Sequence, residues 1–121
     1  MKILVIDDEA GSRCLVENAL LFDGHQVLVA ANGVSGMRLM RQEQPDIVVT
    51  DILMPDQDGL GIIRSLRQEF PMVKIIAISG GGTVGGLDLL VAAGRLGADA
   101  TLAKPFVPEE LSESVNRLVF N

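Results

Sequence analysis

Short apolar runs and longer segments of helical periodicity alternate along the whole chain. The apolar runs predict strands over residues 2–6, 26–30, 47–51, 73–78 and 99–103. The segments that follow them predict helices over residues 12–21, 34–44, 60–69, 87–96 and 109–119. Continuous apolar strands that alternate with helices are typical of a parallel sheet with helices on both faces. We therefore expect one α/β domain over residues 1–121, built on a doubly wound, five-stranded parallel sheet.

Charge and composition exclude several classes of protein. The chain has a net charge of −6 without a Lys/Arg cluster, and aromatic residues make up only 3%, so we expect no direct nucleic-acid binding. No apolar run approaches the roughly 20 residues of a membrane-spanning helix, and the N-terminus does not resemble a signal peptide. The single cysteine, Cys14, excludes an internal disulfide and fits a reducing compartment. We expect a cytoplasmic protein in which Cys14 is half-buried on the first helix.

Reactive side chains stand at the ends of four predicted strands. Asp7 and Asp8 follow the first strand, and Asp51 ends the third. Ser79 closes the fourth strand and Lys104 ends the fifth. The carboxyl ends of parallel strands meet at one edge of the sheet, where open α/β sheets bind their ligands. The sequence therefore predicts one site that contains all five residues.

The side chains at this edge suit the transfer of a phosphoryl group to a carboxylate. Three carboxylates close together must either raise a pKa or hold a cation. Oxygen ligands favour Mg²⁺, or Mn²⁺ in its place, over zinc. Lys104 offers a compact positive charge to a phosphate oxygen, and the Ser79 hydroxyl can hydrogen-bond another. With Asp51 as the nucleophile, the set provides the positioning and charge stabilisation that phosphoryl transfer requires.

Four short motifs carry a resemblance to a known family. They are Ile6-Asp7-Asp8-Glu9, Asp51-Ile52-Leu53-Met54-Pro55 with Gly59, Ser79-Gly80, and Lys104-Pro105-Phe106. In this order and at these spacings they resemble the receiver domain of response regulators in two-component signalling, over essentially the whole chain. The resemblance implies a flavodoxin-like fold with strand order 2-1-3-4-5.

The same resemblance implies roles for the acidic residues. Asp51 matches the phosphoacceptor, which takes a phosphoryl group from a histidine kinase or a histidine phosphotransfer protein. Asp8, Asp51 and the backbone carbonyl of Leu53 match the Mg²⁺ ligands, and Asp7 matches the acid that holds the ion through water. The domain then acts on a downstream protein target, or on an output domain that would follow Asn121, and turns over no external substrate.

The resemblance also covers the fifth strand, with one departure. Ser79 and Lys104 match the pair that grips the phosphoryl group, and the peptide bond between Lys104 and Pro105 is expected to be cis. The family usually carries Tyr or Phe three residues before the lysine, but this chain has Thr101 there. Phe106 is in the wrong place to substitute for that aromatic ring. The family's usual aromatic relay is therefore absent.

The segment before the fourth predicted helix is rich in glycine. Residues 80–86 contain five glycines, and the helix over residues 87–96 carries only two charged side chains. Because glycine raises the conformational entropy of a loop, we expect this helix to be mobile and to become ordered on phosphorylation. Its surplus apolar surface suggests a phosphorylation-dependent dimer face.

Other classes of protein explain the pattern less well. Phosphatases and phosphotransferases of related folds carry a D-x-D-x-[TV] motif after the first strand, which Asp7-Asp8-Glu9-Ala10-Gly11 does not match. A flavodoxin needs a phosphate-binding loop there, and the acids would repel that phosphate. A receiver-like docking module that is not phosphorylated stays an alternative, because of Thr101.

Overall fold

The computed structural model describes residues 1–54, 58–80, 83–84 and 87–119. The main sheet consists of β1 (Lys2–Ile6), β2 (Gln26–Ala30), β3 (Ile47–Asp51), β4 (Lys74–Ser79) and β7 (Ala100–Ala103). Its order is β2-β1-β3-β4-β7, and every neighbouring pair is parallel. Numbered along the chain, this is the predicted order 2-1-3-4-5 of a flavodoxin-like fold, so the predicted fold class is confirmed.

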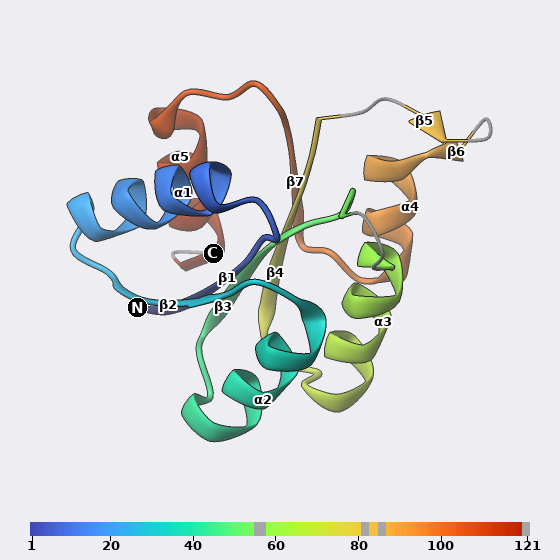
Figure 1. Ribbon diagram of the computed structural model, residues 1–121, viewed down its shortest axis with the longest axis horizontal. Coiled ribbons are helices and arrows are strands. Elements are labelled where there is room, and N and C mark those ends of the chain that lie inside the picture. Colours follow the sequence, from blue (N-terminus) through green and yellow to red (C-terminus); the bar gives the residue numbers. More distant parts are fainter. Residues whose placement is uncertain (55–57, 81–82, 85–86, 120–121) are drawn as a thin grey trace.

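Helices cover both faces of this sheet. They are α1 (Ala10–Phe22), α2 (Gly33–Glu43), α3 (Gly59–Glu69), α4 (Leu89–Leu96) and α5 (Pro108–Val119). In Figure 1, α1 and α5 lie together on one side of the strands, whereas α2, α3 and α4 line the other side. Within the described residues, no helix is long and apolar enough to cross a membrane.

Alternate residues of each central strand supply two separate cores. On β1, Leu4 and Ile6 join the core under α2, α3 and α4, and Ile3 and Val5 join the core under α1 and α5. All four side chains are essentially inaccessible to solvent. Burying one such side chain contributes about 1.5–3 kcal/mol. The double burial explains why the central strands contain continuous apolar runs, at residues 3–6, 47–49 and 75–78.

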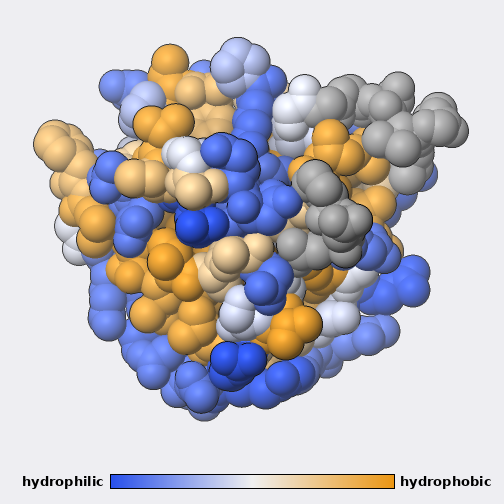
Figure 2. Space-filling model, viewed as in Figure 1, coloured by the Kyte–Doolittle hydropathy of each residue, from blue (hydrophilic) through white to orange (hydrophobic). Residues whose placement is uncertain are grey.

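The edge strand β2 is less covered than the centre of the sheet. Its five residues alternate between exposed, half-buried and buried positions. Figure 2 shows apolar side chains gathered on the visible face over this strand. On α1, Leu15 shares the apolar spacing of Val16 but is 74% exposed. Cys14 was expected to be half-buried, but it is exposed.

The fourth helix differs from the prediction at its start. Residues Leu87–Asp88 form β6, which pairs in the antiparallel direction with β5 (Thr83–Val84). The helix begins at Leu89, because Asp88 is its N-cap and accepts hydrogen bonds from the backbone N–H groups of Leu90 and Val91. The predicted start at residue 87 was therefore wrong. Part of the glycine-rich segment, residues 81–82 and 85–86, lies outside the described residues.

Candidate phosphoacceptor site

The ends of the central strands bring the predicted residues to one sheet edge. Asp51 ends β3 and is paired in register with Ile78, the residue before Ser79 at the end of β4. Asp7 directly follows β1, and its backbone N–H donates to the carbonyl of Ala30 at the end of β2. The side chains of Asp7, Asp51 and Ser79 are buried. Two carboxylates and a hydroxyl therefore lie buried at the carboxyl ends of apolar strands.

Lys104 reaches this edge from the end of β7. Its Nζ donates to Oδ2 of Asp51 at 2.6 Å and lies 4.0 Å from Oδ2 of Asp7. The lysine side chain keeps 30% of its surface exposed, whereas the side chain of Asp51 is only 8% exposed. The peptide bond between Lys104 and Pro105 is cis, as predicted. One ammonium group therefore faces two carboxylates.

Asp51 is held at both of its carboxylate oxygens. Oδ1 accepts a hydrogen bond from the backbone N–H of Leu53 at 3.1 Å, while Oδ2 accepts the bond from Lys104. Burial nevertheless raises the pKa of Asp51 above its ordinary value, and the nearby Asp7 charge raises it further. The hydrogen bond and charge of Lys104 and the Leu53 N–H lower this pKa, but burial outweighs them. The folded protein therefore stabilises the ionised form of Asp51 less well than water does.

The donor set suits a hard divalent cation, although the acids do not converge on one point. Within residues 1–54, 58–80 and 87–119, no three acidic, His or Cys side chains form a ready ligand cluster. Asp8 is half-buried beside the buried Asp7, and Leu53 is exposed at the mouth of the site. Carboxylate and carbonyl oxygens fit Mg²⁺, which keeps several water ligands and needs only a few protein atoms. The raised pKa of Asp51 is the sign that a further positive charge would be stabilised here.

Residues at the start of α1 belong to the site but were not foreseen. Ser12 Oγ accepts a hydrogen bond from Lys104 Nζ at 3.1 Å. The Arg13 guanidinium donates to the backbone carbonyl of Asp7 at 2.9 Å. Glu9 caps the helix through both of its carboxylate oxygens. Only their place just after the two acids could have hinted at these contacts.

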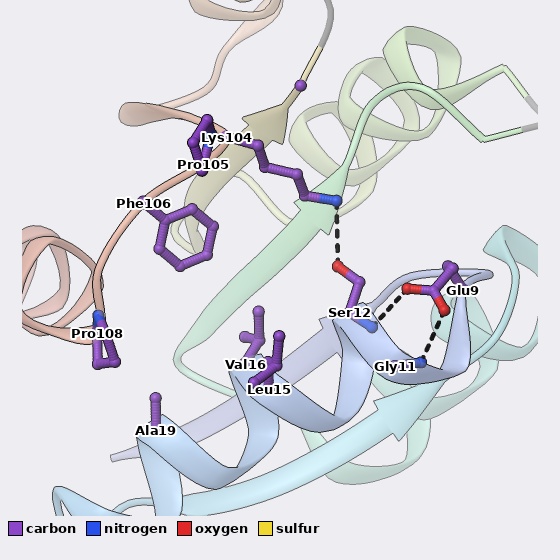
Figure 3. A pocket seen from close by; sticks show the side chains of 11 residues that line it. Glu9, Gly11, Ser12, Leu15, Val16, Ala19, Lys104, Pro105, Phe106 and Pro108 are labelled. Carbon is purple, nitrogen blue, oxygen red and sulfur yellow. Dashed lines mark hydrogen bonds between the residues drawn. The ribbon is translucent and has the colours of Figure 1, made fainter.

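A groove of about 910 Å³ opens beside Lys104, between α1 and the segment that joins β7 to α5. Figure 3 shows Leu15, Val16 and Phe106 along its apolar walls, and Ser12 facing Lys104 at one end. The exposure of Leu15 is explained by this groove, which the residue lines instead of packing into the core.

Thr101, which stands where the family usually has an aromatic residue, lies on β7, the fifth strand of the main sheet along the chain. Thr101 is exposed on β7 and is paired with Ala77 on β4. Phe106 is half-buried and packs against the core under α1 and α5, away from the position of Thr101. No aromatic ring therefore stands at the position of Thr101, as the sequence indicates.

Comparison with known proteins defines the class. A family model described as the response regulator receiver domain matches residues 3–116. The chain therefore belongs to the receiver domains of response regulators, which act in two-component signalling. The resemblance stated from its motifs is confirmed, and so is the signalling class that it implied.

Particular relatives fall into two groups by length. The chain is 38% identical over 118 residues to a probable transcriptional regulator, ycf27, of Porphyra purpurea, covering 98% of this chain and 47% of that protein. It is 31% identical over 116 residues to sporulation initiation phosphotransferase F of Bacillus subtilis, covering 96% of this chain and 91% of that protein. The chain thus spans about half the length of the first group and nearly all of the second.

Solved structures agree with the fold. A CheY-like receiver domain protein from Methanospirillum hungatei superposes with a TM-score of 0.87 at 26% identity, over 97% of this chain and 91% of the other. A putative response regulator from Chloroflexus aurantiacus gives a TM-score of 0.88 at 27% identity, over 99% and 98% of the two chains.

Proposed function

We propose that residues 1–121 act as a phosphoacceptor receiver in which Asp51 takes a phosphoryl group from a phosphohistidine. The observation that carries this proposal is the buried Asp51 carboxylate, only 7% exposed, in direct contact with Lys104 and close to Asp7. A purely structural ion pair would not need a second buried acid that raises the pKa of the first. The donor would be a histidine kinase or a histidine phosphotransfer protein.

In the proposed reaction an Asp51 carboxylate oxygen attacks the phosphorus atom. The bond between phosphorus and the imidazole nitrogen of the donor breaks, and that nitrogen keeps the electron pair. Lys104 and the Ser79 hydroxyl would then each hold an oxygen of the transferred group. Ionised Asp51 is needed for the attack, and the Leu53 N–H keeps Oδ1 oriented.

Asp7, Asp8, Asp51 and the carbonyl of Leu53 are the proposed holders of Mg²⁺, or of Mn²⁺ in its place. When bound, the ion would supply positive charge where charge accumulates on the phosphoryl oxygens. Mg²⁺ at about 100 times its dissociation constant should stabilise the fold by about 2.7 kcal/mol, measured as a rise in Tm. Asp8→Asn should lose most of this rise. The matched change Asp58→Asn, at the exposed N-cap of α3, should keep it.

The groove between α1 and the β7–α5 segment supports an approach for the donor protein. It combines apolar walls with an end at Lys104, which touches the acceptor Asp51.

We infer that the receiver works in the cytoplasm and turns over no external substrate. Its output would be a downstream protein or an output domain.

A phosphorylation-dependent dimer through α4 stays a prediction. Val91 on that helix is 49% exposed, which leaves apolar surface for a second copy. Light scattering on the phosphorylated and unphosphorylated protein would test it.

Acetyl phosphate with Mg²⁺ provides the first functional test. The phosphorylated protein should migrate more slowly in a phosphate-affinity gel, and the shift should disappear in Asp51→Asn but persist in Asp58→Asn. A wild-type protein that never shifts would favour the alternative, a receiver-like docking module that is not phosphorylated.

A further inference from the structure

We propose that Ser12 is a positioning residue for phosphoryl transfer, because its hydroxyl holds the Lys104 ammonium in front of Asp51. This inference rests on the proposed function. Ser12 lies outside the four sequence motifs, and 92 positions separate it from Lys104.

The Lys104 ammonium has three N–H donors, and among the described residues it has three side-chain oxygen neighbours within 4.0 Å. Two of these are carboxylate oxygens, at 2.6 Å on Asp51 and 4.0 Å on Asp7. The third is the neutral Ser12 Oγ at 3.1 Å. A neutral acceptor directs the ammonium without adding a third negative charge beside the two carboxylates. Ser12 is therefore suited to orient Lys104 and unsuited to replace an acid.

The backbone of Ser12 is held in place at the start of α1. Glu9 caps the helix, with Oε2 accepting from the Ser12 N–H at 2.6 Å and Oε1 accepting from the Gly11 N–H at 2.9 Å. Arg13 ties the same turn to the backbone carbonyl of Asp7 at 2.9 Å. Figure 3 shows this chain of contacts, from Glu9 through Ser12 to Lys104.

A lysine on a flexible four-carbon stem loses much rotational freedom when it is fixed. In the resting site, Ser12 and Asp51 share the work of fixing Lys104. When Asp51 gains a phosphoryl group, the ammonium must turn from the carboxylate to a phosphoryl oxygen. The bond to Ser12 can persist through that exchange, and it then keeps Lys104 aimed at the reacting group.

A comparison within the chain separates this role from ordinary helix chemistry. Ser35 has the same place in α2 that Ser12 has in α1, three residues after the N-cap. The backbone N–H of each serine donates to its N-cap side chain. The Ser35 hydroxyl turns back to Asn32, its own cap, which is the usual local bond. The Ser12 hydroxyl instead reaches Lys104, on a distant part of the chain.

The rate constant for phosphorylation by acetyl phosphate, with Mg²⁺ in excess, tests the proposal. Ser12→Ala should slow the reaction about threefold to tenfold, the range expected for one lost hydrogen bond. Ser12→Thr restores a hydroxyl and should recover most of the rate. Ser35→Ala is the matched control for effects on helix stability and should leave the rate unchanged.

A double-mutant cycle shows whether Ser12 acts through Lys104. In a Lys104→Ala background, Ser12→Ala should slow phosphorylation no further. Equal slowing in both backgrounds, or an unchanged rate in Ser12→Ala alone, would overturn the inference and leave the proposed function intact. A wild type that takes no phosphoryl group would instead defeat the proposed function itself.

The unphosphorylated protein gives a second readout. The Lys104 ammonium should give a protected ¹⁵Nζ signal by NMR in the wild type and in Ser12→Thr, and should lose that protection in Ser12→Ala. Equal protection in all three proteins would show that Ser12 does not hold the lysine.

Discussion

At the scale of single residues, the balance of forces on Asp51 sets the chemistry of the site. Burial and Asp7 raise its pKa, and Lys104 does not fully compensate. The ionised form needed for attack on phosphorus is thus the form that the folded protein holds less favourably. A carboxylate in this position gains from any additional positive charge, which connects the pKa to the proposed cation and phosphoryl chemistry.

This balance predicts a stability that depends on pH. Because the folded-state pKa of Asp51 lies above its ordinary value of 3.8, ionisation of this group opposes folding. Its contribution to stability falls as pH rises from 3.8 through the raised pKa. Asp51→Asn should therefore be more stable than wild type at neutral pH, and the gain should shrink as pH falls toward 3.8.

Urea denaturation at several pH values, with a chelator present, measures this difference. The matched Asp58→Asn variant should be no more stable than wild type at neutral pH, since Asp58 is exposed and Asn can also cap α3. An Asp51→Asn protein that is less stable than wild type at neutral pH would contradict a raised pKa for Asp51.

Strand-end residues could be predicted from the sequence, but their helix neighbours could not. Asp7, Asp51 and Lys104 follow recognisable apolar runs, and parallel strands bring such ends together regardless of detail. The contact of Ser12 with Lys104 depends on the placement of α1 and on one lysine rotamer. The exposure of Leu15 could not be predicted for a related reason, because helical periodicity does not reveal a groove beside the helix.

At the scale of elements, Arg67 joins the end of α3 to the end of α4 and to the start of β4. Its guanidinium donates to the backbone carbonyls of Pro71, Val73 and Gly97 and to the carboxylate of Asp99. Lysine cannot reproduce this fork of donors. Arg67→Lys should therefore lower the free energy of unfolding by about 1.5–3 kcal/mol.

Urea denaturation would measure this loss, and Arg64→Lys on the exposed part of α3 is the matched control. The control should change stability by less than about 0.5 kcal/mol. Equal stability of the two variants would mean that the fork at Arg67 is not important for the fold.

Two glycines in helices should respond to alanine in opposite directions. A Cβ on Gly59, at the start of α3, would overlap the backbone carbonyl of Ile52, directly after Asp51. Gly59→Ala should cost about 1–3 kcal/mol, as overpacking does. A Cβ on Gly94, inside α4, would meet nothing within 4 Å, so Gly94→Ala should add up to about 1 kcal/mol.

Thermal unfolding of the two variants beside wild type checks both signs at once. If Gly59→Ala were neutral, the close approach of α3 to the backbone of Ile52 would not constrain the site.

The start of α4 illustrates what periodicity alone misses. The apolar spacing continues back to Leu87, but Asp88 caps the helix after that residue.

At the scale of the whole molecule, a few rules limit the possible orders of the strands. The connection from each strand through its helix to the next parallel strand is right-handed, and strands that are buried on both faces lie inside the sheet. β1, β3 and β4 are buried at nearly every position and lie inside the sheet, with β2 and β7 at the edges. The α/β class was therefore predictable from the strand and helix pattern, and the strand order from the resemblance to receiver domains. The β5–β6 pair was not predictable, since two-residue strands leave no periodicity to detect.

Chemical location of the phosphoryl group tests the central claim most directly. The protein is treated with acetyl phosphate and Mg²⁺, then reduced with borohydride, which converts an aspartyl phosphate to homoserine. Peptide mass spectrometry should find homoserine at position 51, dependent on both reagents. Homoserine at position 7 or 8 would show that Asp51 is not the acceptor. Absence of homoserine from every peptide would contradict phosphoryl transfer to a carboxylate of this chain.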